Sequence, residues 1–212
     1  MIIGATSWVQ PGTYYENARI LEDVVDLVEL LCYTWDEETE KVMGKEVLYL
    51  RELELKYTVH LPADNVANCR RVYSFFKDAE LPVMNFTLHP IPEWEEFIAG
   101  KEDVSLENLV STYPRYSRMT LDIGHAILAG LKPDYFLGTE IKEVHLSGVK
   151  AGEDHQEIID DKELKYLENF SRDGLMVILE IFNLESLMVS KRRVEEWQNR
   201  WMKECGTKRR NI

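Results

Sequence analysis

The sequence has few cysteines, an excess of negative charge and no long hydrophobic run. Its three cysteines (Cys32, Cys69 and Cys205) are widely spaced and form no CxxC pair. This usage is typical of a reducing compartment and argues against a disulfide framework. No stretch approaches the roughly 18 apolar residues of a membrane span, and the first residues lack the basic segment of a signal peptide. We therefore expect a soluble, cytoplasmic protein with no membrane partner.

Positive charge is also scarce. Lys and Arg total 25 against 38 Asp and Glu, which gives a formal net charge of -13 at pH 7. Such a field repels nucleic-acid backbones and anionic lipid surfaces, so neither is expected as a partner. A small phosphorylated substrate stays compatible with this charge, because bound cations can reverse the local field.

Short apolar runs alternate with longer amphipathic segments along the whole chain. The runs that predict strands are Ile2–Trp8, Asp26–Cys32, Tyr57–Leu61, Met84–His89, Val104–Glu107, Met119–Ile123, Ile141–Ser147 and Leu175–Phe182. The segments that predict helices are Thr13–Val24, Asp36–Leu53, Asn65–Asp78, Leu164–Ser171 and Leu184–Lys203. Asp36 has the character of an N-cap, because acidic residues follow it in the first turn.

This alternation predicts an α/β protein that folds as a lean (β/α)8 TIM barrel, with a doubly wound sheet as the alternative. A single domain over residues 1–212 leaves about 26 residues per unit, below the typical barrel total of ~250. The helices after the fourth, fifth and sixth strands are the least regular, since Pro-Ile-Pro and Leu-Lys-Pro-Asp interrupt the periodicity there.

The placement of histidine carries the functional signal. Four of the five histidines end or directly follow a predicted strand, and the fifth lies in the loop after the seventh strand. Carboxylates hold similar positions, and alternation in the last strand turns Ile178 and Glu180 into the barrel and Val177 and Leu179 outward. The residues expected to share one pocket are His60, His89, Glu107, Asp122, His125, His145, Glu153, His155 and Glu180.

Because the carboxyl ends of barrel strands meet on one face, these side chains are expected to converge there. Nine imidazole and carboxylate ligands exceed the four that one zinc ion needs, so several divalent ions are predicted. A structural, hydrogen-bonded role is the ordinary alternative for each histidine taken alone, but it does not explain the whole set. Glu29, Ser7 and Lys150 also lie near the predicted pocket, with core or loop roles as alternatives.

The ordered series His60-Leu-Pro, Leu-His89-Pro, Leu-Glu107-Asn, Leu-Asp122-Ile-Gly-His125, Val-His145-Leu-Ser, Glu153-Asp-His155 and Leu-Glu180 resembles the xylose-isomerase-like TIM-barrel superfamily. That superfamily includes sugar isomerases and epimerases and the endonuclease IV group. The sugar-isomerase resemblance implies one ion held by Glu107, Asp122, His145 and Glu180.

The endonuclease IV-like pattern implies three ions. His60, His89 and Glu107 would match the ligands of the first. Glu107 would bridge to a second ion held by Asp122, His145 and Glu180. The third would be held by His125, Glu153 and His155, although the family pattern has Asp where this chain has Glu153.

One branch of the superfamily resembles the N-terminal part as well. Ile3-Gly-Ala-Thr-Ser-Trp-Val-Gln-Pro through Asp26-Leu-Val-Glu29-Leu is similar to the cobamide-remodelling phosphodiesterases, which implies hydrolysis of the phosphoribosyl linkage in a cobamide nucleotide loop. The expected function is therefore a metal-dependent phosphodiesterase with two or three ions (Zn, Mn or Fe) and with Glu107 and Glu180 as catalytic residues.

Three alternatives remain. A divalent-metal sugar isomerase or epimerase would use Glu107 and Glu180 as an acid/base pair on a sugar substrate. An AP endonuclease is disfavoured by the net charge of -13. A metal-binding protein without catalytic activity would be compatible with the same ligands.

Overall fold

Eight parallel strands close into a barrel. The computed structural model of the chain describes residues 1–171 and 174–208, with side chains of the last helix as far as Trp201. The other residues of the predicted single domain lie outside this description.

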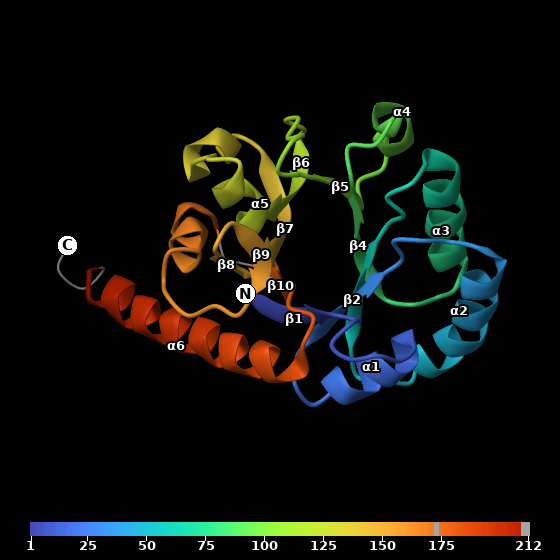
Figure 1. Cartoon of the computed structure of the whole chain (residues 1–212), viewed down its shortest axis with the longest axis horizontal. Coiled ribbons are helices and arrows are strands. Elements are labelled where there is room, and N and C mark those ends of the chain that lie inside the picture. The colour runs from blue at the N-terminus through green and yellow to red at the C-terminus, as the bar shows by residue number, and fades with distance from the viewer. Residues whose placement is uncertain (172–173, 209–212) are drawn as a thin grey trace.

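The strands are β1 (Ile2–Thr6), β2 (Leu27–Leu31), β3 (Lys56–His60), β4 (Val83–Leu88), β5 (Val104–Glu107), β6 (Arg118–Asp122), β7 (Glu140–Leu146) and β10 (Met176–Leu179). Their order around the barrel is β1-β10-β7-β6-β5-β4-β3-β2, and Figure 1 shows them enclosed by helices. The predicted (β/α)8 barrel is confirmed, and the doubly wound alternative is wrong.

The helices on the outside vary greatly in length. They are α1 (Tyr14–Leu21), α2 (Glu37–Leu50), α3 (Val66–Asp78), α4 (Trp94–Ile98), α5 (Ile123–Leu128) and α6 (Leu184–Lys208), with 3-10 helices η1 (Pro133–Phe136) and η2 (Leu164–Asn169). Asp36 caps α2 as predicted, because its carboxylate accepts a hydrogen bond from the Thr39 backbone N–H at 2.7 Å. The irregular region of the sequence corresponds to the five-residue α4, the six-residue α5 and a β5–β6 connection that contains no helix in the described chain.

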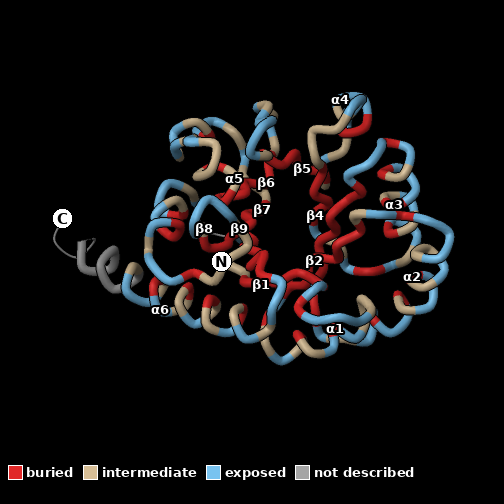
Figure 2. The backbone as a smooth tube through the Cα atoms, in the orientation of Figure 1, coloured by how far each residue is buried: buried red, intermediate tan, exposed pale blue. Residues whose placement is uncertain are grey.

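Apolar residues form two layers. The larger one lies between the strands and the helices and includes Val177 and Leu179, whereas Ile178 packs inside the barrel against Leu27 and Met176. This separation confirms the predicted alternation along the last strand. Figure 2 shows the buried strands as a central ring inside the more exposed helices.

Above this apolar floor, the barrel interior is polar. Glu143 lies two residues before His145 and is fully buried, and it accepts hydrogen bonds from the Thr58 hydroxyl (3.0 Å) and the Asn85 amide (2.8 Å). Asn85 also donates to Ser105 at 2.8 Å. Barrel interiors are usually filled by branched apolar residues. A hydrogen-bonded polar layer directly below the strand ends is therefore unusual, and it indicates that polar side chains at the strand ends form a functional site.

A small antiparallel hairpin, which the sequence analysis missed, follows β7. It consists of β8 (Gly148–Lys150) and β9 (Glu153–Gln156). Ala151 and Gly152 both have positive φ (54° and 87°), the conformation that a two-residue hairpin turn requires. No helix in the described part of the chain has the length and hydropathy needed to cross a bilayer. The cytoplasmic location stays a prediction.

Candidate metal centre

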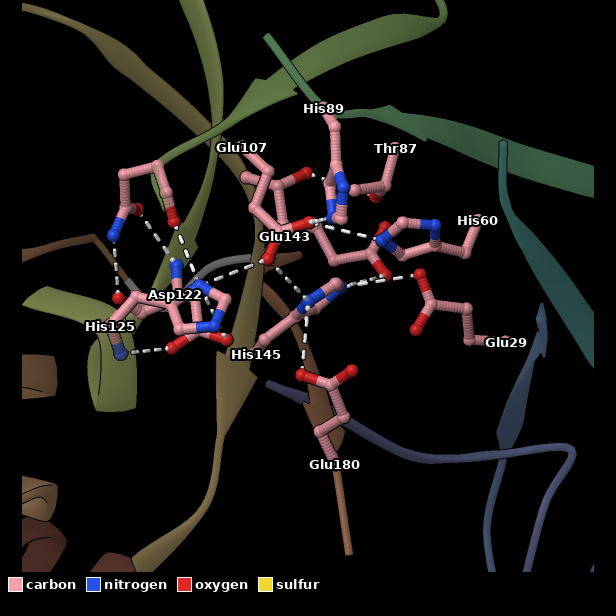
Figure 3. Close-up of polar contacts among 12 residues, drawn as sticks. Glu29, His60, Thr87, His89, Glu107, Asp122, His125, Glu143, His145 and Glu180 are labelled. Carbon is pink, nitrogen blue, oxygen red and sulfur yellow. Dashed lines mark hydrogen bonds and ion pairs between the residues drawn. The ribbon is translucent and has the colours of Figure 1, made fainter. Parts of the chain in front are cut away.

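Glu107 lies at the middle of the carboxyl-terminal face of the barrel, at the end of β5. Its Oε2 is 3.0 Å from His60 Nε2 and 3.1 Å from His89 Nε2. Its other oxygen, Oε1, is 3.4 Å from His125 Nδ1 and 3.6 Å from His145 Nδ1. The two oxygens of one carboxylate therefore face two different sets of imidazoles, and Figure 3 shows these side chains around Glu107.

The ligand atoms fall into compact groups whose members lie within 4.8 Å of one another. One group is His60, His89 and Glu107, a second is Glu107, Asp122 and His145, a third is His125, Asp154 and His155, and a fourth, fully buried, is Glu29, Glu143 and His145. Glu180 lies beside the second and third groups, with its Oε2 at 3.5 Å from His145 Nδ1 and 3.6 Å from His155 Nδ1. All the sequence-predicted site residues except Glu153 are thus brought together.

Asp122 links strand β6 to helix α5. As the N-cap of α5, it accepts a hydrogen bond from the His125 backbone N–H at 2.6 Å. Asn108 holds the same segment, because its amide donates to the Asp122 carbonyl (2.8 Å) and its side-chain oxygen accepts from the Asp122 N–H (2.9 Å). The carbonyl of Asn108 also lies 2.9 Å from His125 Nδ1. Asn108 therefore positions two candidate ligands at once.

The hairpin corrects one predicted ligand. Side chains alternate along a strand, so Glu153 and Asp154 point to opposite sides of β9. Glu153 is exposed, while Asp154 Oδ2 is 3.3 Å from His125 Nε2 and Asp154 Oδ1 is 3.5 Å from His155 Nε2. Asp154, not Glu153, is the carboxylate that the structure places with these histidines. We call His125, Asp154 and His155 the rim group.

Backbone geometry allows the rim group to form. A Cβ on Gly124 would lie 2.9 Å from Asp154 Cβ, so the hairpin can approach α5 this closely only because residue 124 is glycine. His155 has a φ of 54°, in the left-handed region that non-glycine residues seldom occupy. Its N–H donates to Ser147 Oγ at 3.0 Å, which helps to hold this conformation. Strain of this kind costs on the order of 1–3 kcal/mol and is concentrated at functional sites.

Tyr33, which the sequence analysis did not select, contacts the centre from the end of β2. Its hydroxyl donates to Glu180 Oε1 at 3.0 Å, and its ring meets the His60 ring edge-on with centroids 4.4 Å apart. Burial is the first cause that raises the pKa of Tyr33, and the Glu180 charge adds to it, so the phenol stays protonated. Glu180 therefore has one oxygen held by Tyr33 and the other directed at the imidazoles.

Glu29 approaches His145 from the side opposite to Glu107. Its Oε1 lies 3.2 Å from His145 Nε2, and both residues are buried. The sequence left the role of Glu29 open between a core edge and the pocket, and the structure places its carboxylate in the barrel interior. Of the other residues with open roles, Ser7 accepts a hydrogen bond from the Leu31 N–H at 3.0 Å, and Lys150 is exposed on β8.

The charged groups in this cluster shift one another's pKa values. Burial lowers the pKa of His125, but its hydrogen bond to Glu107 and the charges of Asp122 and Glu107 outweigh burial and raise it to about 10. Burial likewise lowers the pKa of His145, and the charges of Glu29, Glu107 and Glu180 raise it well above its usual value. Without metal, protonated imidazoles therefore compensate the buried carboxylates.

The donor set fits divalent cations. Both ring nitrogens of His145 and both carboxylate oxygens of Glu29 are buried without a hydrogen bond of good geometry among the described residues, although Glu29 Oε1 and His145 Nε2 lie at ion-pair distance, 3.2 Å. Buried polar atoms are normally satisfied, and several ionised carboxylates in one pocket repel each other unless cations compensate them. Mixed imidazole and carboxylate ligands suit Zn, Mn or Fe.

Solved structures resemble this chain over almost its whole length. No family model matches the sequence, and no curated protein matches it. A structure described as a D-tagatose 3-epimerase-like protein has a TM-score of 0.67 at 21% identity and covers 97% of this chain and 100% of its own. SacUVDE has a TM-score of 0.56 at 9% identity, covering 93% of this chain and 99% of its own. D-psicose 3-epimerase, solved in the presence of D-fructose, has a TM-score of 0.52 at 10% identity and covers 92% and 90%.

These likenesses show the fold.

Proposed function

We propose that this protein is a metal-dependent phosphodiesterase that hydrolyses a small phosphodiester. The observation that carries the proposal is the position of Glu107, whose Oε2 faces His60 and His89 while Oε1 faces His125 and His145. A carboxylate between two sets of imidazoles is suited to bridge two cations, and paired cations are typical of enzymes that transfer phosphoryl groups.

Divalent ions at such a site would supply Lewis-acid polarisation of phosphate oxygens and a lower pKa for water. The protein's own contribution is to hold geometry and charge. Glu107 would fix the spacing between the first two groups, and Asp122 would tie the second group to the rim group through α5. Tyr33 holds Glu180 Oε1, so that Oε2 is directed into the centre and can accept a proton from the attacking water.

The rim group supports the choice of reaction. A single-ion isomerase would need Glu107, Asp122, His145 and Glu180 and would leave His60, His89 and His155 without a role. In the phosphodiesterase proposal these histidines hold further ions, so that two or three Zn, Mn or Fe ions are bound, with Asp154 in place of Glu153. As a specific substrate we propose the nucleotide loop of a cobamide, cleaved at its phosphoribosyl linkage, because of the N-terminal resemblance.

A divalent-metal sugar epimerase is the second candidate. The specific observation in its favour is the buried set Glu107, Asp122, His145 and Glu180, which could hold one ion between two carboxylates suited to acid and base roles. Two of the similar structures are described as an epimerase or epimerase-like. Here Glu107 and Glu180 would exchange a proton with a ketose.

One experiment separates the two candidates. The purified protein is reconstituted with Zn, Mn or Fe and assayed on a cobamide, on a generic aryl phosphodiester and on a panel of ketoses. The phosphodiesterase proposal expects turnover of a phosphodiester that is lost in a Glu107 variant. Epimerisation of a ketose, with every phosphodiester left intact, would transfer the assignment to the second candidate. An activity that survives substitution of Glu107 would contradict both.

A further inference from the structure

A cavity of about 630 Å³ opens beside the metal centre, between the ends of β1, β2 and β10 and the start of α2. Its size falls within the range of small-molecule sites. We call it the aromatic pocket, and the lining residues used here are Trp8, Tyr14, Leu31, Tyr33, Val42 and Phe182.

Two residues that line the pocket also contact candidate ligands of the metal centre. Tyr33 donates to Glu180 and contacts His60 edge-on. Phe182 packs on the His155 ring, with centroids 4.9 Å apart and planes tilted by 43°. A molecule whose phosphate lies at the metal centre would therefore have this pocket beside its adjoining group.

The polar groups along the pocket are mostly engaged with the protein itself. At the floor, the Leu31 N–H donates to Ser7 Oγ, and the Leu31 carbonyl accepts from the Tyr14 hydroxyl at 3.2 Å. The Tyr33 hydroxyl is held by Glu180. Burial raises the pKa of Tyr14 well above its usual value, so this phenol stays uncharged. The surface offered to a ligand is therefore mainly aromatic faces and aliphatic carbon.

Two large apolar side chains are exposed at this site. Trp8 is 54% exposed and Phe182 is 38% exposed. Exposed aromatic residues on a concave surface mark binding sites more often than isolated surface apolar residues do. They also favour flat ligands, because aromatic rings gain from stacked or edge-on contact with another ring.

The rim of the pocket is acidic. Asp36 and Glu38 are exposed lining residues, and the Asp36 carboxylate stays ionised because the backbone N–H of Thr39 and its neighbours hold its pKa low. Together with the net charge of -13, this rim disfavours an anionic ring.

We propose that the aromatic pocket binds a flat, uncharged or cationic aromatic ring carried by the substrate, next to the group that reacts at the metal centre. The position of the reacting phosphate rests on the proposed function. The binding of the ring rests on the pocket alone. The pocket thus assigns a substrate class that joins a phosphodiester to a flat, uncharged or cationic aromatic ring, in preference to a simple sugar.

The test uses benzamide, benzamidine, benzoate and ribose as probes. Benzamide is neutral, benzamidine is cationic and benzoate is anionic on the same ring, and ribose is polar and has no aromatic ring. Binding to the full chain, with and without Zn, is followed by ligand-observed NMR. Benzamide and benzamidine should bind at least about tenfold more tightly than benzoate or ribose, a difference of about 1.4 kcal/mol. Equal binding of all four probes, or no binding of the first two, would overturn the proposal.

Two variants locate the binding. Val42→Trp should fill the pocket from α2 and weaken benzamide about tenfold, whereas Leu48→Trp, at a 58% exposed position on the same helix, should leave it unchanged. Trp8→Ala removes a mostly exposed side chain and is therefore expected to fold even if Val42→Trp does not. It should also weaken benzamide binding. Unchanged benzamide binding in both pocket variants would contradict the assignment.

Hydrolysis of a cobamide and of an aryl phosphodiester, measured on the same wild-type protein, separates the two proposals. Ring binding at the pocket without hydrolysis of either substrate would support the ring-binding proposal and contradict the phosphodiesterase proposal. Hydrolysis together with benzamide binding that is unchanged in Val42→Trp and Trp8→Ala would contradict the ring-binding proposal and support the phosphodiesterase proposal.

Discussion

The residues at the strand ends and the rim group differ in how they are held. His60, Glu107, His145 and Glu180 lie at or next to the ends of barrel strands and are 0–3% exposed. The side chains of the rim group are 15–29% exposed and come from the short helix α5 and the hairpin strand β9. The strand-end set is therefore fixed by the closed barrel and its polar interior, whereas the rim group depends on a hairpin in which one of its own members, His155, has a left-handed backbone conformation. Substitutions should be costlier in the first region than in the second.

Glu107→Gln should produce the largest effect. The variant keeps the side-chain size but removes the charge that faces both sets of imidazoles, so the metal spacing and the position of the attacking water are lost. Misplacement of reacting groups costs on the order of 100-fold in rate. We expect a loss of phosphodiester turnover of that size with the fold retained, measured beside thermal unfolding. Glu102→Gln, at an exposed position just before β5, is the matched control and should behave as wild type. Near-normal turnover of a folded Glu107→Gln protein would remove the bridging role.

Glu29→Gln tests whether the contact between Glu29 and His145 contributes to metal affinity. Groups that contact a metal-binding histidine from behind typically change metal affinity by about 10–100-fold. We expect a loss near the lower limit of that range, because Glu107 and Glu180 still face the other nitrogen of His145. Metal titration of the variant against Glu52→Gln, at an exposed position, measures the effect. Equal affinities would show that Glu29 does not support His145.

Asp154→Ala and Glu153→Ala form an adjacent pair that tests the rim group. The Asp154 variant should lose the ion of the rim group and keep the others, with an intermediate loss of turnover. The Glu153 variant should keep all ions, because its side chain is exposed. Elemental analysis of both proteins checks this. The reverse result, loss of metal in the Glu153 variant alone, would restore the sequence-based assignment.

The smallest expected effect is a pH dependence in the metal-free protein. The pKa of His125 is raised to about 10 in the folded state, above an unfolded value of about 6.5. The folded state therefore binds more protons between these values, and stability falls as pH rises from about 6.5 to 10. The Tm of the metal-free wild-type protein is therefore expected to fall over this interval. His125→Gln should flatten the dependence, and a Tm that rises with pH in the wild type would contradict the assignment.

The same two regions show how far the sequence could be interpreted. The barrel and the strand-end residues were predictable because alternating runs define the strands and place His60, Glu107 and Glu180 at strand termini. Glu143 was missed, although the alternation Glu143-Val-His145 already indicated that a polar residue two positions earlier would share the interior with His145. The choice between Glu153 and Asp154 was not predictable, because it depends on the register of a hairpin that periodicity did not reveal.

Tyr33 lay outside prediction for a different reason. It follows β2 without any local pattern, and its role depends on a contact with Glu180, 147 residues away in sequence. Contacts of this kind arise only when the barrel closes and brings β2 and β10 to either side of β1.

The number of ions that each chain binds tests the central claim most directly. The purified protein is stripped of metal, reconstituted separately with Zn, Mn and Fe, freed of excess ion and subjected to elemental analysis together with the Asp154→Ala and Glu153→Ala variants. The account predicts two or three ions per wild-type chain, one fewer in Asp154→Ala and no change in Glu153→Ala. One ion or none in the wild-type protein under every condition would contradict it.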